Sequence, residues 1–420
     1  MRKLLRGARI IDPSQGLDVI GDILIDGENI AALGENLDPG DCEIADCRGL
    51  VAAPGFVDMH VHLRDPGQTH KEDIYTACRA AAAGGVTSLL AMPNTVPPMD
   101  SPELVADLLR RAGTASANVY TAACVTRGMA GEDCTDMAAL LEAGAIAVSD
   151  DGKPVKRASC LLEGLAKARE LGLVFAAHCE DPDLASGGLM NQGPVSERLG
   201  VPGVPPAAED CGVAREIAAA ASIGAPVHIC HVSTKGSVEL IRDAKRRGVR
   251  VTAETCPHYL LLTDETLEAK DADYRMNPPL GSEEDRLALI EAVSAGTLDA
   301  ISTDHAPHTP EEKADFGRAP NGAIGMETSF AAVWTALRDK LGLSDVIALM
   351  STNPAGILGI PAGTLKPGAS ADIALIDPDE TWTVDPDKLH GKSRNTPFKG
   401  MELTGRVRAT YLKGKKVFEL

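Results

Sequence analysis

The chain has 420 residues, of which 44% are hydrophobic and only 3% aromatic. This length exceeds the usual size of a single core, so we expect one large domain and a smaller one. Sixty acidic residues against 41 basic ones give a net charge of −19, which argues against a nucleic-acid partner or an anionic membrane surface.

No apolar stretch is long enough to span a membrane, and the run at Leu4–Leu5 is too short for a signal peptide. The ten cysteines are scattered and form no Cys-x-x-Cys pair. A chain of this size needs no disulfides to hold its core, so we expect a reduced, cytoplasmic protein.

Both ends of the chain alternate short apolar runs with turn residues. Residues 1–53 contain the run Ile23–Ile25, and residues 363–420 contain the run Ile373–Ile376. This pattern is typical of short antiparallel strands and hairpins. We therefore predict that residues 1–53 and 363–420 form one small composite β domain, a β-sandwich, and that the middle of the chain is inserted into it.

The middle segment, residues 54–362, alternates strand-like runs with amphipathic helical stretches such as residues 101 onward, 207–222 and 237–247. Eight strand candidates end near His62, Asn94, Thr126, Asp151, His178, His231, Thr255 and Asp304. Eight repeats of strand and helix predict an α/β fold, a (β/α)8 TIM-like barrel. A doubly wound sheet has a similar order of elements and is the alternative.

The most informative motif is the His60-x-His62 pair at the end of the first of these strands. Residues two apart on a strand point to the same face, so both imidazoles can reach one metal ion. Asp58 shares this face one layer deeper, and we expect it to orient a ligand. Arg64 follows just beyond the strand and can clamp an anion beside the metal.

Further ligand types follow the other strands: an aspartate pair at Asp150 and Asp151, then His178, His231 and Asp304. In a (β/α)8 barrel these strand ends meet at one mouth. Four histidines and two carboxylates suffice for two divalent ions with one bridging carboxylate, and the absence of thiolates favours zinc, manganese or cobalt.

Two details of this site stay open on the residues alone. Asp150 and Asp151 cannot both face the mouth from one extended strand, and alternation does not choose between them. A carbamylated Lys153 or Lys156 is a weaker alternative as the bridge.

His228 lies three residues before His231 and so points to the opposite face, which indicates a core position.

Two adjacent metal ions activate a bridging water and polarise a carbonyl, which serves the hydrolysis of an amide or ester, or its reverse. Asp304 is placed to take the proton of a metal-bridging hydroxide and pass it to the leaving nitrogen, as a general acid and base. Arg64 and Asn94 can together hold a substrate carboxylate at the barrel mouth.

Motifs along nearly the whole chain resemble those of the amidohydrolase superfamily and, within it, of the class I bacterial dihydroorotases. They are His60–Gly67, Met92–Thr95, Ser149–Gly152, His178–Glu180, His231–Ser233, Glu254–His258, Arg275–Pro279, Thr303–His308 and Ser351–Ala355.

The resemblance implies reversible cyclisation of N-carbamoyl-L-aspartate to L-dihydroorotate in de novo pyrimidine (UMP) biosynthesis, with two Zn²⁺ ions per subunit. By position, His60, His62 and Asp304 would hold one zinc and His178 and His231 the other. The bridging carboxylate of the family matches Asp151.

The resemblance also assigns the substrate contacts. Arg64 and Asn94 would bind the carboxylate with His308 and close to the ligand His62, and Asn277 would contact the ring. The Asn321–Gly322 backbone would close over the site, although Asn321 departs from the Phe-Gly pairing expected there.

Related activities are the main alternatives. Allantoinases and hydantoinases share the barrel and the metals but usually lack an arginine after His-x-His-Leu, so Arg64 favours dihydroorotate. A non-catalytic scaffold for aspartate transcarbamoylase would be expected to have lost metal ligands, and this chain keeps them. The resemblance also allows a homodimer and association with aspartate transcarbamoylase, and no residue pattern decides either.

Overall fold

The computed structural model describes residues 2–420 and shows a parallel barrel joined to a mixed sheet. The barrel strands are β6 (Phe56–Val61), β7 (Val86–Ala91), β8 (Asn118–Ala123), β9 (Ala147–Val148), β10 (Val174–Ala177), β13 (Val227–Ile229), β14 (Val251–Thr255) and β15 (Ala300–Ile301). They pair in this order and all in parallel.

The first and last strands of this sheet also meet. Val61 forms a parallel bridge with His305, and the His62 amide donates to the His305 carbonyl at 2.9 Å. A doubly wound sheet would leave these two edges apart. The predicted barrel is therefore confirmed, and the strands end up to three residues before the positions predicted from the sequence.

A helix follows each barrel strand and covers its outer side. These helices are α1 (Ile74–Ala83), α2 (Pro102–Ala112), α3 (Met137–Glu142), α4 (Ala158–Leu171), α7 (Ala207–Ile223), α8 (Lys235–Arg246), α10 (Glu283–Ser294) and α11 (Ser329–Leu337). Helix α8 shows the pattern that folds them: Val238, Ile241 and Ala244 are buried at a spacing of three residues, while charged side chains face outward.

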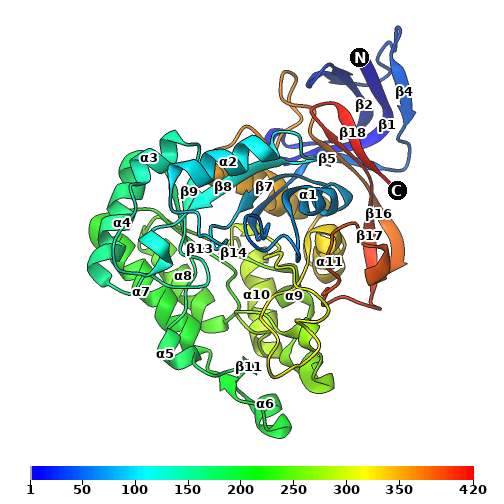
Figure 1. Cartoon of the computed structure of the whole chain (residues 1–420). Coiled ribbons are helices and arrows are strands. Elements are labelled where there is room, and N and C mark those ends of the chain that lie inside the picture. The colour runs from blue at the N-terminus through cyan, green and yellow to red at the C-terminus, as the bar shows by residue number, and fades with distance from the viewer. Residues whose placement is uncertain (1) are drawn as a thin grey trace.

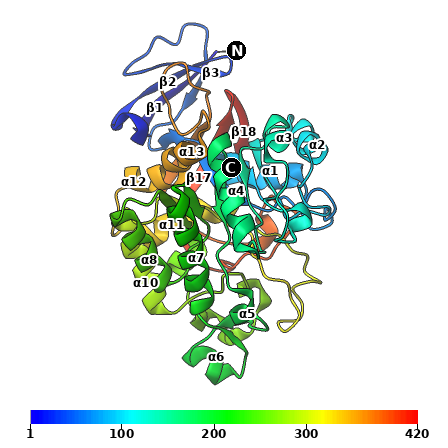
Figure 2. The ribbon, with the colours of Figure 1, turned by 90° about the vertical axis from the view of Figure 1, so that its left-hand side faces the viewer.

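Shorter elements fill the connections. They are α5 (Pro182–Ala185), β11 (Met190–Asn191), α6 (Pro194–Leu199) and β12 (Gly203–Val204) after β10, α9 (Pro257–Leu261) after β14, and α12 (Leu343–Ile347) and α13 (Asn353–Leu358) after α11. Helices α5 and α6 project at the end of the molecule opposite the mixed sheet (Figures 1 and 2).

The two ends of the chain form the mixed sheet, and their blue and orange-to-red strands lie side by side in Figure 1. Its strands are β1 (Arg2–Asp12), β2 (Leu17–Asp26), β3 (Asn29–Gly34), β4 (Glu43–Asp46), β5 (Val51–Pro54), β16 (Ile373–Thr383), β17 (Glu402–Leu412) and β18 (Lys415–Glu419). They follow the order β18-β17-β16-β5-β1-β2-β3, with β4 beside β1.

This sheet has a core of its own, which includes Ile10, Ile23, Ile373 and Tyr411. The predicted fold class, a barrel with a small β domain from both chain ends, is confirmed. The pairing differs in one respect from the expected antiparallel strands, because β1 runs parallel to β4 and β5. The domain boundaries at 53/54 and 362/363 stay a prediction, and β5 extends one residue past the first.

Within residues 2–420, no helix combines the length and the apolar character that crossing a membrane requires.

Candidate metal centre

Five barrel strands bring six side chains of metal-ligand types together at their C-terminal ends. His60 lies in β6 and His62 directly follows it, and the others follow β9, β10, β13 and β15 directly or within three residues. All six side chains are buried: His60, His62, Asp151, His178, His231 and Asp304. They are the six residues that the sequence predicts as ligands.

Asp151 lies at the centre of this cluster. Its Oδ1 atom is 3.2 Å from His60 Nε2, 3.6 Å from His178 Nδ1 and 3.7 Å from His231 Nε2. Its Oδ2 atom is 3.6 Å from His62 Nε2. The side chains thus form two groups of a size that fits one ion each, His60 with His62 and His178 with His231, and Asp151 belongs to both.

Asp304 lies at the edge of the first group. Its Oδ1 atom is 3.0 Å from His62 Nε2 and 3.7 Å from His60 Nε2. Burial opposes the ionisation of this carboxyl, but the hydrogen bond from His62 and the nearby imidazoles lower its pKa to about 2. Asp304 is therefore a carboxylate, able to bind a cation or to accept a proton.

The cluster has the donor atoms of a cation site. Within residues 2–420, both ring nitrogens of His60 and the Oδ1 atom of Asp151 are buried without a hydrogen-bond partner. In addition, His178 Nδ1 and His231 Nε2 face each other at 2.9 Å. Buried polar atoms are normally paired, and imidazole and carboxylate donors are the usual ligands of zinc and its neighbours. The residues therefore fit divalent cations.

Of the aspartate pair, Asp151 faces the cluster and Asp150 faces away from it. The Thr126 amide donates to Asp150 Oδ1 at 3.1 Å, and the Thr126 hydroxyl donates to Asp150 Oδ2. Lys153 and Lys156 are exposed on the loop that follows. The geometry thus brings one carboxylate of this loop, and neither lysine, into the cluster.

Glu254 also contacts the cluster, although its sequence pattern alone assigns it no role in the site. Its Oε1 atom lies 3.3 Å from His60 Nδ1, and its Oε2 atom accepts a hydrogen bond from Ser302 and lies 3.5 Å from His228 Nε2. Two features of the sequence could have indicated this role. Glu254 lies near the end of β14, and it begins the motif Glu254–His258, which resembles that of the dihydroorotases.

Asp58 contacts the main chain of one candidate ligand and the residue next to another, and its expected role in orienting a ligand stays a prediction: the His60 amide donates to its Oδ1 atom at 3.3 Å. Its two oxygens accept hydrogen bonds from the Thr303 amide at 3.0 Å and the Thr303 hydroxyl at 2.6 Å. Burial raises the pKa of Asp58 to about 6. Since Thr303 directly precedes Asp304, Asp58 holds the backbone that carries this residue.

A cavity of about 120 Å³ opens over the cluster, well below the size of sites for drug-sized molecules. Its lining contains every predicted substrate contact except His308. The lining residues include His62, Arg64, Asn94, Gly152, Asn277, Ala306, Asn321 and Gly322. His308 lies behind the cavity, where its Nε2 atom is 2.9 Å from the Asn321 carbonyl and 3.2 Å from Arg64 Nη2.

Arg64 is a largely buried cation at this cavity. Its Nε atom donates to the Pro307 carbonyl at 3.1 Å, and no carboxylate of residues 2–420 lies within 4.0 Å of its guanidinium. Burial lowers its pKa, and the charges of Asp304 and Asp151 partly oppose this shift. A buried guanidinium without a carboxylate partner is a favourable site for a bound anion.

Asn94 joins the two halves of the site. Its Oδ1 atom is 2.8 Å from His62 Nδ1, and its Nδ2 atom donates to Asp151 Oδ2 at 3.0 Å. It therefore fixes the orientation of two side chains of the cluster and borders the cavity as well.

Three of the site residues adopt a left-handed backbone conformation, which L-residues other than glycine rarely do. The φ angles are +58° at Arg64, +38° at His231 and +48° at Asp304. Each follows a barrel strand closely. Backbone strain of this kind is typical of functional sites, where the surrounding structure maintains it.

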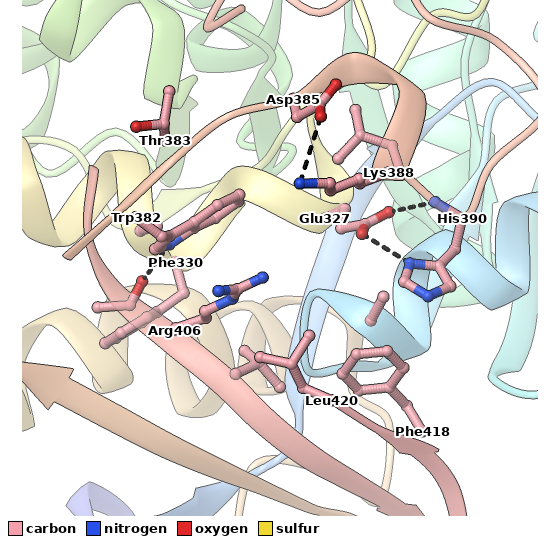
Figure 3. Close-up of a pocket in the computed structure, with 15 residues that line it drawn as sticks. Glu327, Phe330, Trp382, Thr383, Asp385, Lys388, His390, Arg406, Phe418 and Leu420 are labelled. Atoms are coloured by element: carbon pink, nitrogen blue, oxygen red, sulfur yellow. Dashed lines mark hydrogen bonds and ion pairs between the residues drawn. The ribbon is translucent and has the colours of Figure 1, made fainter. Parts of the chain in front are cut away.

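A second and larger cavity, of about 410 Å³, lies outside the barrel mouth, between α11 and the strands β16–β18. Figure 3 shows its aromatic side chains, Phe330, Trp382 and Phe418, and the ion pair that links Glu327 to His390. None of the predicted site residues lines it.

Comparison with known proteins agrees with this site. A model of the dihydro-orotase-like family matches residues 49–237. The dihydroorotase of Geobacter sp. (strain M21) is 47% identical over 423 residues, which cover 100% of both chains. The dihydroorotase of Pelotomaculum thermopropionicum is 46% identical over 100% of this chain and 99% of its own.

Solved structures of cyclic amidases have the same fold. The L-hydantoinase (dihydropyrimidinase) of Arthrobacter aurescens has a TM-score of 0.89 at 25% identity, over 99% of this chain and 96% of its own. The dihydropyrimidinase of Brevibacillus agri NCHU1002 has a TM-score of 0.87 at 28% identity, over 100% and 95%. Full-length identity to the curated relatives is decisive: the chain belongs to the dihydroorotase family.

Proposed function

We propose that this chain is a metal-dependent dihydroorotase that interconverts N-carbamoyl-L-aspartate and L-dihydroorotate in pyrimidine biosynthesis. The observation that carries the proposal is Arg64, a cation without a carboxylate partner, in the cavity above a cluster of four histidines and two aspartates. A carboxylate-bearing cyclic amide matches both features, and the full-length relatives carry the same name.

Two divalent cations, which we propose to be zinc, would be held at the cluster. His60, His62 and Asp304 would bind one and His178 and His231 the other, with Asp151 between them. When bound, such cations lower the pKa of a shared water and polarise a carbonyl. The remaining work falls to the side chains of the chain itself.

Asp304 would handle the proton. In the hydrolytic direction, its carboxylate takes the proton of the attacking water and delivers it to the ring nitrogen as the carbon–nitrogen bond breaks. In the synthetic direction the same carboxylate removes the proton from the carbamoyl nitrogen as the carbon–nitrogen bond forms, and passes it to the oxygen that leaves as water. The low pKa of Asp304 keeps the carboxylate ionised before it takes this proton and makes the protonated group a strong acid toward the ring nitrogen.

Arg64 would hold the substrate carboxylate, with Asn94 beside it. The fixed geometry of a guanidinium allows two parallel hydrogen bonds to a carboxylate, and this would orient the ring amide toward the cluster. Asn277 and the Asn321–Gly322 backbone line the same cavity and are placed to contact the ring. We propose that His308 affects the binding of the substrate carboxylate indirectly, by contacting the guanidinium of Arg64.

The solved relatives make a hydantoinase-type cyclic amidase the competing activity. Its substrates carry no carboxylate at this position, so a buried Arg64 would have no counter-ion. A role as a mere scaffold for aspartate transcarbamoylase is disfavoured because the complete set of ligand types lies together. A cytoplasmic location, a homodimer and association with aspartate transcarbamoylase stay predictions.

Metal analysis combined with ultraviolet monitoring of dihydroorotate hydrolysis tests the proposal. We expect about two metal ions per chain, loss of activity on chelation, and turnover of dihydroorotate in preference to hydantoin, dihydrouracil and allantoin. Turnover of these neutral amides without turnover of dihydroorotate would assign the protein to the competing activity. A metal-free protein with neither activity would favour the scaffold.

A further inference from the structure

Lys313 is a buried cation beside the cavity, in the loop that follows β15, and it has no acidic partner. Its ammonium donates to three backbone carbonyls: Ala272 at 2.9 Å, Arg275 at 3.2 Å and Pro320 at 2.9 Å. An ammonium group has three N–H donors, so all are used. No carboxylate oxygen of residues 2–420 lies within 4.0 Å of Lys313 Nζ.

These three carbonyls belong to two segments that line the cavity. Ala272 and Arg275 lie just before Asn277, and Pro320 lies just before Asn321 and Gly322. The segments also contact each other directly: the Gly322 amide donates to the Arg275 carbonyl at 2.9 Å, and Arg275 Nη2 donates to Asn321 Oδ1 at 3.1 Å. Lys313 thus bonds to both sides of one junction.

The nearby charges do not explain why a lysine is buried here. The carboxylates of Asp271 and Asp273 are paired with Lys399, whose Nζ atom lies 2.5 Å and 2.7 Å from them. The other charged groups that act on Lys313 are cations, Arg275 and Arg64. Burying an ammonium is unfavourable unless its hydrogen bonds are satisfied, and here backbone carbonyls alone satisfy them.

We propose that Lys313 is a positioning residue for the reaction, whose ammonium holds segments 272–277 and 320–322 together so that Asn277 and the Asn321–Gly322 backbone face the substrate. This inference rests on the proposed function for its catalytic consequence. The junction itself is a property of the protein without substrate, and it can be measured separately.

The junction is also sensitive to pH. Burial lowers the pKa of Lys313 to about 7, with Arg275 and Arg64 acting in the same direction and Asp273 and Asp271 against it. The neutral amine has two N–H donors in place of three and no charge. The two segments are therefore held less firmly as the pH rises through neutrality.

Hydrogen–deuterium exchange on the metal-loaded protein without substrate tests the junction directly. We compare the wild type, Lys313→Met and a control, Lys366→Met, which changes an exposed lysine before β16 in the same way. Lys313→Met is expected to speed exchange in segments 272–277 and 313–322 alone, and Lys366→Met to leave it unchanged. Unchanged exchange in Lys313→Met, or faster exchange throughout the barrel, would overturn the proposal.

Steady-state kinetics with dihydroorotate test the consequence. Lys313→Met is expected to lower kcat/KM roughly 10- to 100-fold at low pH, because segments that contact the ring are displaced, with the metal content unchanged. The ratio of wild-type to variant kcat/KM should shrink as the pH rises through neutrality, and Lys313→Arg should restore part of the loss. A constant ratio across this range would contradict the role of the ammonium.

If the wild type fails to turn over dihydroorotate at all, the proposed function fails, and hydrogen–deuterium exchange alone then decides whether Lys313 holds the two segments together.

Discussion

Glu254 and His60 contact each other on the side of the imidazole that faces away from Asp151. Glu254 Oε1 lies 3.3 Å from His60 Nδ1, while His60 Nε2 lies 3.2 Å from Asp151 Oδ1. A carboxylate beside one imidazole nitrogen favours the tautomer that carries its proton there, which leaves the other nitrogen free for a cation. Glu254 therefore orients a candidate ligand from a position outside the cavity.

Replacing Glu254 by Gln should weaken metal binding without removing a ligand. We expect metal affinity to fall by about 10- to 100-fold, with activity regained at saturating metal, because His60 loses the negative charge beside its Nδ1 atom. Competition with a chelator measures the affinity. Glu239→Gln, on the exposed face of α8, is the matched control. Unaltered affinity in Glu254→Gln would show that His60 is oriented by other contacts.

Arg64→Ala should impair substrate binding and leave the metal in place. Removing a charged partner of a buried carboxylate costs about 2–5 kcal/mol, so a loss of this size is expected in kcat/KM for dihydroorotate. Arg318→Ala, whose side chain is 90% exposed, is the control. Metal analysis decides the interpretation, since an equal loss of metal in Arg64→Ala would contradict the clamp role.

Asp304→Asn should abolish most of the turnover while the fold is kept. The amide oxygen can still accept from His62, but the side chain no longer accepts the proton of the attacking water. A decrease of about 10²- to 10⁴-fold in kcat is expected at saturating metal. Asp315→Asn, at an exposed carboxylate, should behave like the wild type. Near-normal kcat in Asp304→Asn would assign the proton transfer to another group.

Glu216, on α7, should make the protein less stable as the pH rises. It is 3% exposed, and burial raises its pKa from 4.5 to about 7. Between these values the folded state binds more protons than the unfolded state, so the free energy of unfolding falls with rising pH and levels off above about 7.

Glu216→Gln removes this penalty. We expect the variant to be more stable than the wild type by about 3 kcal/mol above neutrality, and the difference to disappear in acid. Thermal unfolding followed by circular dichroism at both extremes, with metal held constant, measures it. Glu163→Gln, at an exposed position of α4, is the control. A difference that does not change with pH would rule out the titration of Glu216 as the cause.

Most of the candidate metal centre can be predicted from the sequence because a barrel brings the ends of its strands together. His60, His178, His231 and Asp304 are far apart in the chain, yet each lies near the end of a parallel strand, and these ends meet. The local periodicity and the order of the elements are therefore sufficient to predict that these ligand types lie close together.

Other features depend on contacts that the pattern does not encode. The choice of Asp151 over Asp150 rests on Thr126, which binds Asp150 from the neighbouring strand end. Glu254 can orient His60 only because the rotamer of His60 turns its Nδ1 atom toward Glu254. Asp58 is expected to orient a ligand, and the pattern does not show that its main partner is Thr303, just beyond the last strand of the barrel.

The left-handed backbone at Arg64, His231 and Asp304 also restricts which amino acids these positions can accept. Asn and Gly tolerate this conformation, whereas β-branched residues such as Val, Ile and Thr do not. Replacement by a β-branched residue would thus disturb the path of the chain as well as the chemistry. Each of these positions at the barrel mouth is therefore restricted in two ways, by the group that its side chain must bind and by the backbone conformation that it must adopt.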